Sequence, residues 1–394
     1  MKKTCILGLL LLGLAGSLSA QKKGLVPLPE RVDIQSEPAP QQAIIDQAWV
    51  GVGIKKPYAI QHDYTLPFQG APSYRFELQK DDNTLQDYRA GDTKGRAELS
   101  YCYAVADDLK PFDAEAYKNI ILAKTVYHYG KGHCPQASEM EYRFSVRIPA
   151  SLSEKVNTIF AQWHGMPERT LLQTPDGEVK KISNQEFATL LERMTFKKDT
   201  GFDKIFLKNG NGTIRKDAAG NPRFEIAQEP NGWKVEQGGY PPMAFGFSSG
   251  YFYIKANSDR KYLTDKSDRC NADPAKTAVM KPVRSEFKAS TIAYKLPIGE
   301  FPRDTWVSFT VKVRWSKYGG ASETIEKPGR LDVWMSYEKN GATCSENIVK
   351  DQEILIGRND EQGYYFKFGI YRVGNSTEPV VYNLAGYSEK LIKQ

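Results

Sequence analysis

Cysteine and histidine are scarce in this chain of 394 residues, which contains five cysteines and four histidines. The cysteines show no CxxC spacing, so the sequence does not predict a thiolate metal cluster. One of them, Cys5, lies in an N-terminal apolar run. For the other four, the sequence leaves open whether they form disulfides or stay as free thiols: Cys102, Cys134, Cys270 and Cys344.

Long apolar runs are also missing beyond the N-terminus. Lys2 and Lys3 precede an apolar run that ends near Leu14, and small residues follow up to Ala20. This order is typical of a signal peptide, which we expect to span residues 1–20. The run is too short to cross a bilayer comfortably. We therefore expect an exported protein, periplasmic or secreted, that is not anchored in a membrane. We also expect it to act as a monomer.

The excess of positive charge is modest. There are 54 Lys and Arg residues against 47 Asp and Glu, a formal charge of +7, which falls to +5 when Lys2 and Lys3 are removed (7 − 2). Such a balance is compatible with a polyanionic partner or with a plain solvated surface. It does not by itself predict binding to nucleic acid. The hydrophobic share of 40% supports a packed core.

Alternation of apolar and polar residues dominates the chain. Residues 140–148, 306–315 and 330–337 each place apolar side chains on one face and polar ones on the other, and residues 73–78 and 251–256 behave alike. Many such segments, separated by Gly, Pro and Asn, are typical of antiparallel strands in a sandwich. We predict an all-β jelly-roll sandwich with a groove, formed by residues 21–170 and 233–394.

Residues 171–232 break this pattern. Ser183 and Glu186 form a capping box, and apolar residues from Phe187 to Met194 follow at helical spacing. The rest of the segment is basic, polar and rich in turns. We predict an inserted, partly helical, thumb-like basic arm that closes over an anionic chain. A solvated excursion without function is the alternative.

A possible site of chemistry lies in residues 158–165. If this segment is a strand, Ile159, Ala161 and Trp163 share one face, while Gln162 and His164 share the other. An amide donor beside an imidazole suits binding a carboxylate while removing a nearby proton. The alternative is that His164 is an ordinary surface histidine or is hydrogen-bonded in the core, without a role in chemistry.

A second strand is predicted at residues 364–371. Its apolar face is opposite a face that carries two phenols, an ammonium group and a gap at Gly369, which would let a ligand approach the backbone. The polar face consists of Tyr365, Lys367, Gly369 and Tyr371.

A third strand, residues 94–100, places Arg96, Glu98 and Ser100 on one face. Arginine is a natural partner of carboxylate or sulfate. Glu98 either holds Arg96 in place or forms an ordinary pair with it.

These three strands together resemble the signature motifs of jelly-roll polysaccharide lyases, a group that includes alginate lyases. Three further blocks, residues 125–132, 233–240 and 357–360, resemble heparin lyases of the heparinase I type. The resemblance extends over nearly all of the chain after residue 20.

The resemblance implies β-elimination in heparin and highly sulfated heparan sulfate at uronic acid residues. Gln162 and Arg96 would neutralise the uronate carboxylate, and His164 would act as the base. Tyr371 would act as the acid and is also a candidate to share the role of base. The predicted contacts to substrate are Lys94, Lys124, Arg169, Tyr365, Lys367 and Cys134. Each basic residue could equally be a solvated charge, and Cys134 a small buried hydrophobe.

The resemblance also implies calcium. Its oxygen ligands would be Glu236, a main-chain carbonyl near Tyr262, Asn359 and Asp360. The sequence has no EF-hand spacing, and the pair Asn359 and Asp360 is also typical of a turn. One departure from the family is the lack of a histidine in the arm at residues 201–204, which gives His164 more weight.

Other functions remain open at this point. A lyase for alginate or another polyuronate would share the three strand motifs without needing the basic arm. A non-catalytic carbohydrate-binding sandwich would need no base and acid. A glycoside hydrolase is disfavoured, because no strand carries two acidic residues at i and i+2 beside an aromatic face.

Overall fold

The computed structural model describes 13 stretches and two single residues of the chain, and all structural statements below refer to these. They are residues 49–52, 56–82, 95–101, 134, 137–165, 171–174, 176–183, 204–206, 213, 224–226, 234–235, 240–264, 286–359, 363–373 and 376–394. The predicted signal peptide lies outside them. No helix in these parts is long and apolar enough to cross a membrane.

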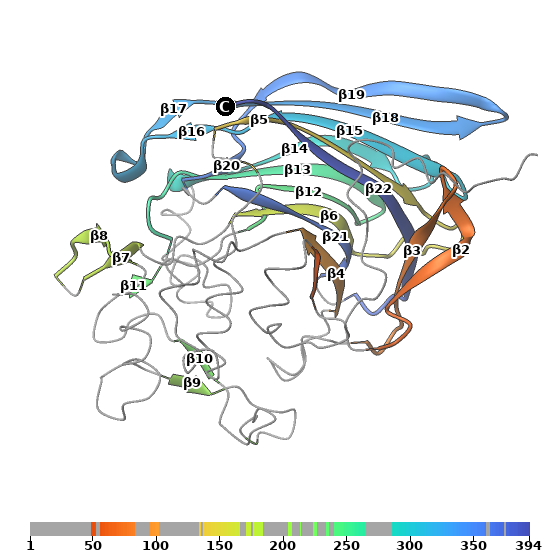
Figure 1. Cartoon of the computed structure of the whole chain (residues 1–394), viewed down its shortest axis with the longest axis horizontal. Helices are drawn as coiled ribbons and strands as arrows, with labels where there is room; N and C mark the ends of the chain where they lie inside the picture. The colour runs from red at the N-terminus through yellow and green to blue at the C-terminus, as the bar shows by residue number, and fades with distance from the viewer. Residues whose placement is uncertain are drawn as a thin grey trace, which may run out of the picture.

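Two large β-sheets form the two layers of the molecule (Figure 1). The first sheet has the order β1 (Trp49–Val52), β4 (Gly95–Tyr101), β21 (Tyr364–Arg372), β6 (Thr158–Gly165), β12 (Met243–Ser248), β13 (Tyr251–Asp259) and β14 (Lys288–Pro297), with β20 (Gly357–Arg358) beside β13. The second has the order β19 (Ala342–Ile354), β18 (Gly329–Lys339), β15 (Trp306–Arg314), β5 (Glu139–Arg147), β22 (Val380–Lys393), β3 (Ala71–Leu78) and β2 (Ile60–Phe68). Neighbours along both orders are antiparallel, so the predicted all-β sandwich is confirmed.

Aromatic rings fill the space between the two sheets. Phe144 of the second sheet lies 5.4 Å from Phe245 and 5.5 Å from Phe366 of the first, measured between ring centroids. Trp163 of the first sheet packs edge-on against Tyr142 at 5.1 Å. Since these rings are buried on one face of each strand, the alternation seen in the sequence decides which face is left for a site.

The predicted strands agree with this packing. The apolar positions of residues 140–148 are at most 1% exposed, and so are those of residues 307–315. Residues 331, 333 and 335 are also buried, while Tyr337 is only half-buried. The alternating pattern therefore predicted both the strands and the side that faces the core.

The inserted segment contains short strands where it is described. β7 (Leu171–Gln173) pairs with β8 (Val179–Lys181) and β11 (Lys234–Val235), and β9 (Lys204–Phe206) pairs with β10 (Phe224–Ile226). Most of the predicted helix at residues 183–194 lies outside the described residues, so the helical arm stays a prediction. Among the described residues, helical structure comprises the 3-10 turn η3 (Gly320–Ser322), between β16 (Lys317–Tyr318) and β17 (Ile325–Lys327), and residues 286–287.

A β-bulge in β6 corrects one prediction. Ala161 pairs with Phe245 and Phe368, but the next pairs along β6 involve Ile159 and skip Phe160. Phe160 is 1% exposed and joins Ala161 and Trp163 in the core, whereas Ile159 is half-buried and lies opposite Tyr371. The prediction that Ile159 shares a face with Ala161 was wrong, because two consecutive residues of a bulge can face the same side.

Gly369 lies at the same irregularity, in a backbone conformation with φ +134°. A Cβ atom there would meet the carbonyl oxygen of Ala97 at 2.3 Å and the Cα of Glu98 at 2.6 Å. Glycine is therefore required by the packing of β21 against β4, and not by the approach of a ligand to the backbone.

We predict that Gly369→Ala lowers the free energy of unfolding by more than about 2 kcal/mol, since the added Cβ meets backbone atoms that cannot move aside. Gly341→Ala is the matched control, because Gly341 also has a positive φ, +75°, but nothing lies within 4 Å of its Cβ position. That control should cost about 1 kcal/mol. Urea denaturation measures both, and equal costs would contradict the steric explanation.

Candidate active site

The three strands with the predicted site residues lie side by side in the first sheet, in the order β4, β21, β6 (Figure 1). The pairing places Tyr371 opposite Arg96, Lys367 opposite both Ser100 and Gln162, and Tyr365 opposite His164. The register therefore brings three segments that are far apart in the sequence onto one sheet face. This face points away from the aromatic core and is called the site face below.

The carboxylate of Glu98 is the centre of the site. It is 1% exposed and accepts a hydrogen bond from Lys367 Nζ at 2.9 Å and one from Gln162 Nε2. Arg96 Nε lies 3.4 Å from the same carboxylate. Of the two roles left open by the sequence, Glu98 takes the first: it holds Arg96, and it holds Gln162 and Lys367 as well.

The hydrogen bond between Glu98 and Gln162 crosses β21. Glu98 and Gln162 belong to strands on either side of β21, and the residue of β21 opposite Glu98 is Gly369. Lys367 of β21 donates to the same carboxylate, so the three strands are joined at this point. A Cβ atom at Gly369 would meet the backbone of β4 and the buried ring of Phe76, so this glycine serves the packing of the sheet.

The cluster carries a net positive charge. Arg96 and Lys367 contribute two cations and Glu98 one anion, a balance of +1 (2 − 1). Burial alone would lower the pKa of Arg96, but the Glu98 carboxylate and then Tyr371 outweigh it, so this pKa is raised and the guanidinium stays charged. One further negative charge, such as a carboxylate, would bring the cluster to neutrality.

Tyr371 and His164 lie at opposite ends of the cluster. The guanidinium of Arg96 lies over the ring of Tyr371, 4.3 Å from its centroid, which holds the phenol beside the cation. His164 is half-buried, and its ring lies 5.9 Å from that of Tyr365. A phenol, a guanidinium, an amide and an imidazole therefore follow one another along the site face.

Gln162 has one polar atom without a protein partner. Its Nε2 donates to Glu98, and its Oε1 is buried and has no hydrogen-bond donor among the described residues. Only one of the two N–H groups of the amide is used by Glu98. The second N–H is the group that could donate to a bound carboxylate.

The thiol of Cys134 is placed in the core. Cys134 is 0% exposed and its Sγ donates to the carbonyl oxygen of Tyr364 at 3.4 Å. Burial raises its pKa to about 12. This placement corresponds to the small buried hydrophobe considered above and not to a side chain on the site face. Cys134 and Cys344 are both free, while Cys102 and Cys270 lie outside the described residues.

Several predicted residues cannot be placed. Lys94, Lys124 and Arg169, expected to bind substrate, lie outside the described residues, as do Glu236 and Asp360, expected to bind calcium.

The two described calcium candidates meet near η3. Asn359 Nδ2 donates to the carbonyls of Arg260 and Gly320, at 2.8 and 2.7 Å, and the amide N–H of Tyr262 donates to Glu323 at 2.9 Å. Because both N–H groups of the Asn359 side chain are used, its Oδ1 is the end left for a cation, which fits the oxygen ligands of calcium. Within the described stretches, no group of three or more His, Cys, Asp or Glu is placed to hold a metal.

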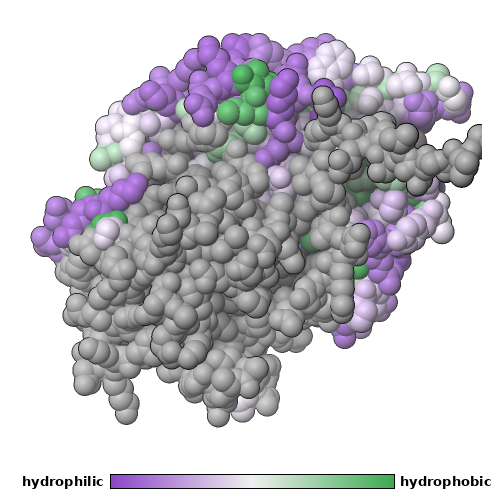
Figure 2. Space-filling view, in the orientation of Figure 1, coloured by the Kyte–Doolittle hydropathy of each residue, from purple (hydrophilic) through white to green (hydrophobic). Residues whose placement is uncertain are grey.

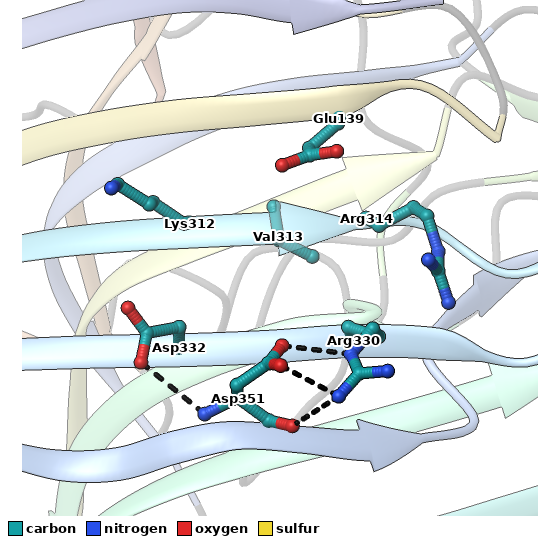
Figure 3. A pocket seen from close by; sticks show the side chains of 7 residues that line it. All are labelled: Glu139, Lys312, Val313, Arg314, Arg330, Asp332 and Asp351. Atoms are coloured by element: carbon teal, nitrogen blue, oxygen red, sulfur yellow. Dashed lines mark hydrogen bonds and ion pairs between the residues drawn. The ribbon is translucent and has the colours of Figure 1, made fainter.

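A hollow on the outer face of the second sheet is a poor candidate for a polyanion site (Figure 3). Its three basic and three acidic side chains balance, and Arg330 is held by Asp351 through hydrogen bonds of 2.7 and 2.6 Å. Figure 2 shows that the surface along this side of the molecule is mostly hydrophilic. The charged residues of the hollow are Glu139, Lys312, Arg314, Arg330, Asp332 and Asp351.

Sequence reasoning placed the residues around Glu98 correctly on one face but did not identify Glu98 as their common partner. It also did not extend the site face beyond β6, to β12, β13 and β14. The alternation of residues 251–256 was a signal for that extension, because it marks which side chains of β13 point away from the core.

We predict that Glu98→Gln lowers the free energy of unfolding by about 3 kcal/mol. The substitution removes the buried carboxylate and leaves the positive charges of Arg96 and Lys367 without a negative partner. Glu326→Gln is the matched control, since Glu326 forms an exposed pair with Lys317 at 2.7 Å and should change stability by less than about 0.5 kcal/mol. Chemical denaturation at neutral pH measures both. A Glu98→Gln protein as stable as the control would show that the cluster does not depend on this charge.

The chain as a whole is similar to known polysaccharide lyases. A family model described as polysaccharide lyase matches residues 45–384. The chain is 58% identical over 373 residues to heparin lyase I from Pedobacter heparinus, covering 95% of both proteins. Among solved structures, alginate lyase A1-II' is 11% identical with a TM-score of 0.32, covering 90% of this chain and 99% of that one. An alginate lyase from Pseudomonas aeruginosa is 11% identical with a TM-score of 0.31, covering 86% and 88%.

At such low scores the two alginate lyases carry no argument about this chain. The family model and the relative from Pedobacter heparinus each cover most of the chain, and the range of the family model includes all three strands of the site. The chain belongs to the polysaccharide lyase family.

Proposed function

We propose that this protein cleaves heparin and highly sulfated heparan sulfate by β-elimination at sulfated uronic acid residues, giving unsaturated oligosaccharides. The observation that carries the proposal is the Glu98 cluster with its net positive charge, flanked by His164 and Tyr371 on one sheet face. The choice of heparin is supported by the 58% identity to a heparin lyase I.

The site residues divide the reaction between them. Arg96 and the second N–H of Gln162 bind the uronate carboxylate, which makes the C5 proton more acidic and stabilises the enolate-like intermediate. His164 removes that proton, the electron pair forms the C4–C5 double bond, and the C4–O bond breaks. Tyr371 gives its proton to the leaving oxygen, and it is also the candidate to share the base role.

Glu98 and Lys367 have positioning roles in this scheme. Lys367 is 3% exposed and its ammonium is engaged by Glu98, so it contributes positive charge near the carboxylate more than a direct contact to sulfate. Lys94, Lys124, Arg169 and the arm are the proposed contacts to sulfate, and Tyr365 offers a ring beside His164.

We expect His164→Ala and Tyr371→Phe each to reduce the formation of unsaturated product from heparin by at least about 100-fold, as for the loss of a proton-transfer group. The assay follows the ultraviolet absorbance of the new double bond. His62→Ala and Tyr64→Phe are matched controls in β2 of the other sheet, where Tyr64 is 76% exposed, and they should keep full activity. Full activity of both site variants would refute the mechanism.

The same assay separates the competing functions. Comparing heparin, heparan sulfate and alginate tests the lyase for another polyuronate, which would prefer alginate. A carbohydrate-binding sandwich without activity would give no unsaturated product from any of the three.

Calcium is part of the proposal, with Glu236, the carbonyl near Tyr262, Asn359 and Asp360 as its ligands. A bound calcium ion would supply positive charge and tie these segments together. Export through a signal peptide at residues 1–20 and action as a monomer are proposed on the sequence pattern alone.

Millimolar calcium should raise the melting temperature of the metal-free protein by several degrees, because a ligand that binds only the folded state stabilises it. Glu236→Gln and Asp360→Asn should abolish this shift, since each removes a charged oxygen ligand. Glu326→Gln should keep it. The calcium assignment fails if all three variants show the shift of the parent protein in differential scanning calorimetry.

A further inference from the structure

The site face continues past β6 onto β13 and β14, where two tyrosines and two lysines gather. Along β13, the side chains of Tyr251, Tyr253 and Lys255 are half-buried and alternate with fully buried core residues. Tyr253 pairs with Lys295 of β14. The four residues therefore lie on the same face as Gln162 and His164.

Strand β12 lies between the Glu98 cluster and the tyrosines and lysines of β13 and β14, and it carries only small side chains on the site face. Its residues on the site face are small: Ala244, Gly246 and Ser248. Ala244 lies between Gln162 and Lys255, which are its partners on β6 and β13. Two strand spacings, about 10 Å, separate the Glu98 cluster from β13 across β12.

Tyr253 leans over β12. A Cβ atom at Gly246 would lie 2.8 Å from the hydroxyl oxygen of Tyr253, so the phenol occupies the space above this glycine. Its hydroxyl makes no hydrogen bond within the described part of the chain. Burial raises the pKa of Tyr253 to about 12, so the hydroxyl remains a proton donor at neutral pH.

Among the described residues, no carboxylate forms an ion pair with either of the two lysines. The ammonium of Lys295 lies 3.6 Å from the centroid of the Tyr251 ring, and neither Lys255 nor Lys295 forms an ion pair among the described residues. By contrast, Lys317 of the other layer lies 2.7 Å from Glu326. Two uncompensated cations, one of them oriented by an aromatic ring, favour an anionic ligand.

We propose that Tyr251, Tyr253, Lys255 and Lys295 form an outer binding site for a sulfate-bearing sugar unit of the same chain whose scissile uronate lies at the Glu98 cluster. The lysines meet the anionic groups, the hydroxyl of Tyr253 donates a hydrogen bond, and the rings offer flat surfaces to the sugar. The proposal rests on the proposed function and names a part of the substrate that this function leaves unassigned.

The test is the double variant Lys255→Gln/Lys295→Gln, assayed on long heparin and on the shortest heparin oligosaccharide that the parent protein cleaves. We expect KM for long heparin to rise by about tenfold with kcat within about twofold, because binding is lost away from the reacting bond. The short oligosaccharide, which does not reach β13, should be cleaved as by the parent. Lys339→Gln, an exposed lysine at the end of β18, is the control and should change neither.

A binding measurement keeps this test independent of catalysis. On immobilised heparin, the double variant should elute at lower salt than the parent and the control, since fewer charges hold the polymer. Equal elution together with an unchanged KM would overturn the outer site. If the parent yields no unsaturated product, the proposed function fails, and the elution difference still decides whether these lysines bind the polymer.

Discussion

The buried carboxylate of Glu98 is the interaction on which the site depends. It joins β4, β21 and β6 through Arg96, Lys367 and Gln162, and its charge keeps two cations in place, one of which, Lys367, is itself buried. Without it, the cations would repel one another and the amide would lose its orientation. The cluster is therefore both an element of the fold and the electrostatic basis of the proposed chemistry.

The sandwich provides this cluster with a stiff support. Aromatic rings pack the opposite face of the same three strands, so the polar side chains stand on a backbone that is fixed from behind. The bulge at Phe160 and the glycine at position 369 adapt the packing of the sheet locally. The proposed reaction and the core packing thus use opposite faces of the same sheet. The small residues of β12 leave room for the polysaccharide to continue toward β13.

The fold could be predicted from the sequence largely because strands alternate with a period of two. Residues 140–148 and 306–315 have the predicted faces, since burial of one side is a local property of each strand. Ile159 was assigned to the wrong face because a bulge leaves no mark in the alternation. The role of Glu98 depends on the register of three distant strands, which no single segment of sequence contains. For the helix of the arm and for two of the four calcium ligands, Glu236 and Asp360, the predictions stay open because they lie outside the described residues.

A crystal structure of the Tyr371→Phe protein with a heparin oligosaccharide would test the central claim most directly. We expect a uronate carboxylate bound by Arg96 and the free N–H of Gln162, with its sugar ring between His164 and residue 371 and Glu98 still bonded to Lys367. An oligosaccharide whose carboxylates all lie away from Arg96 and Gln162 would contradict the account.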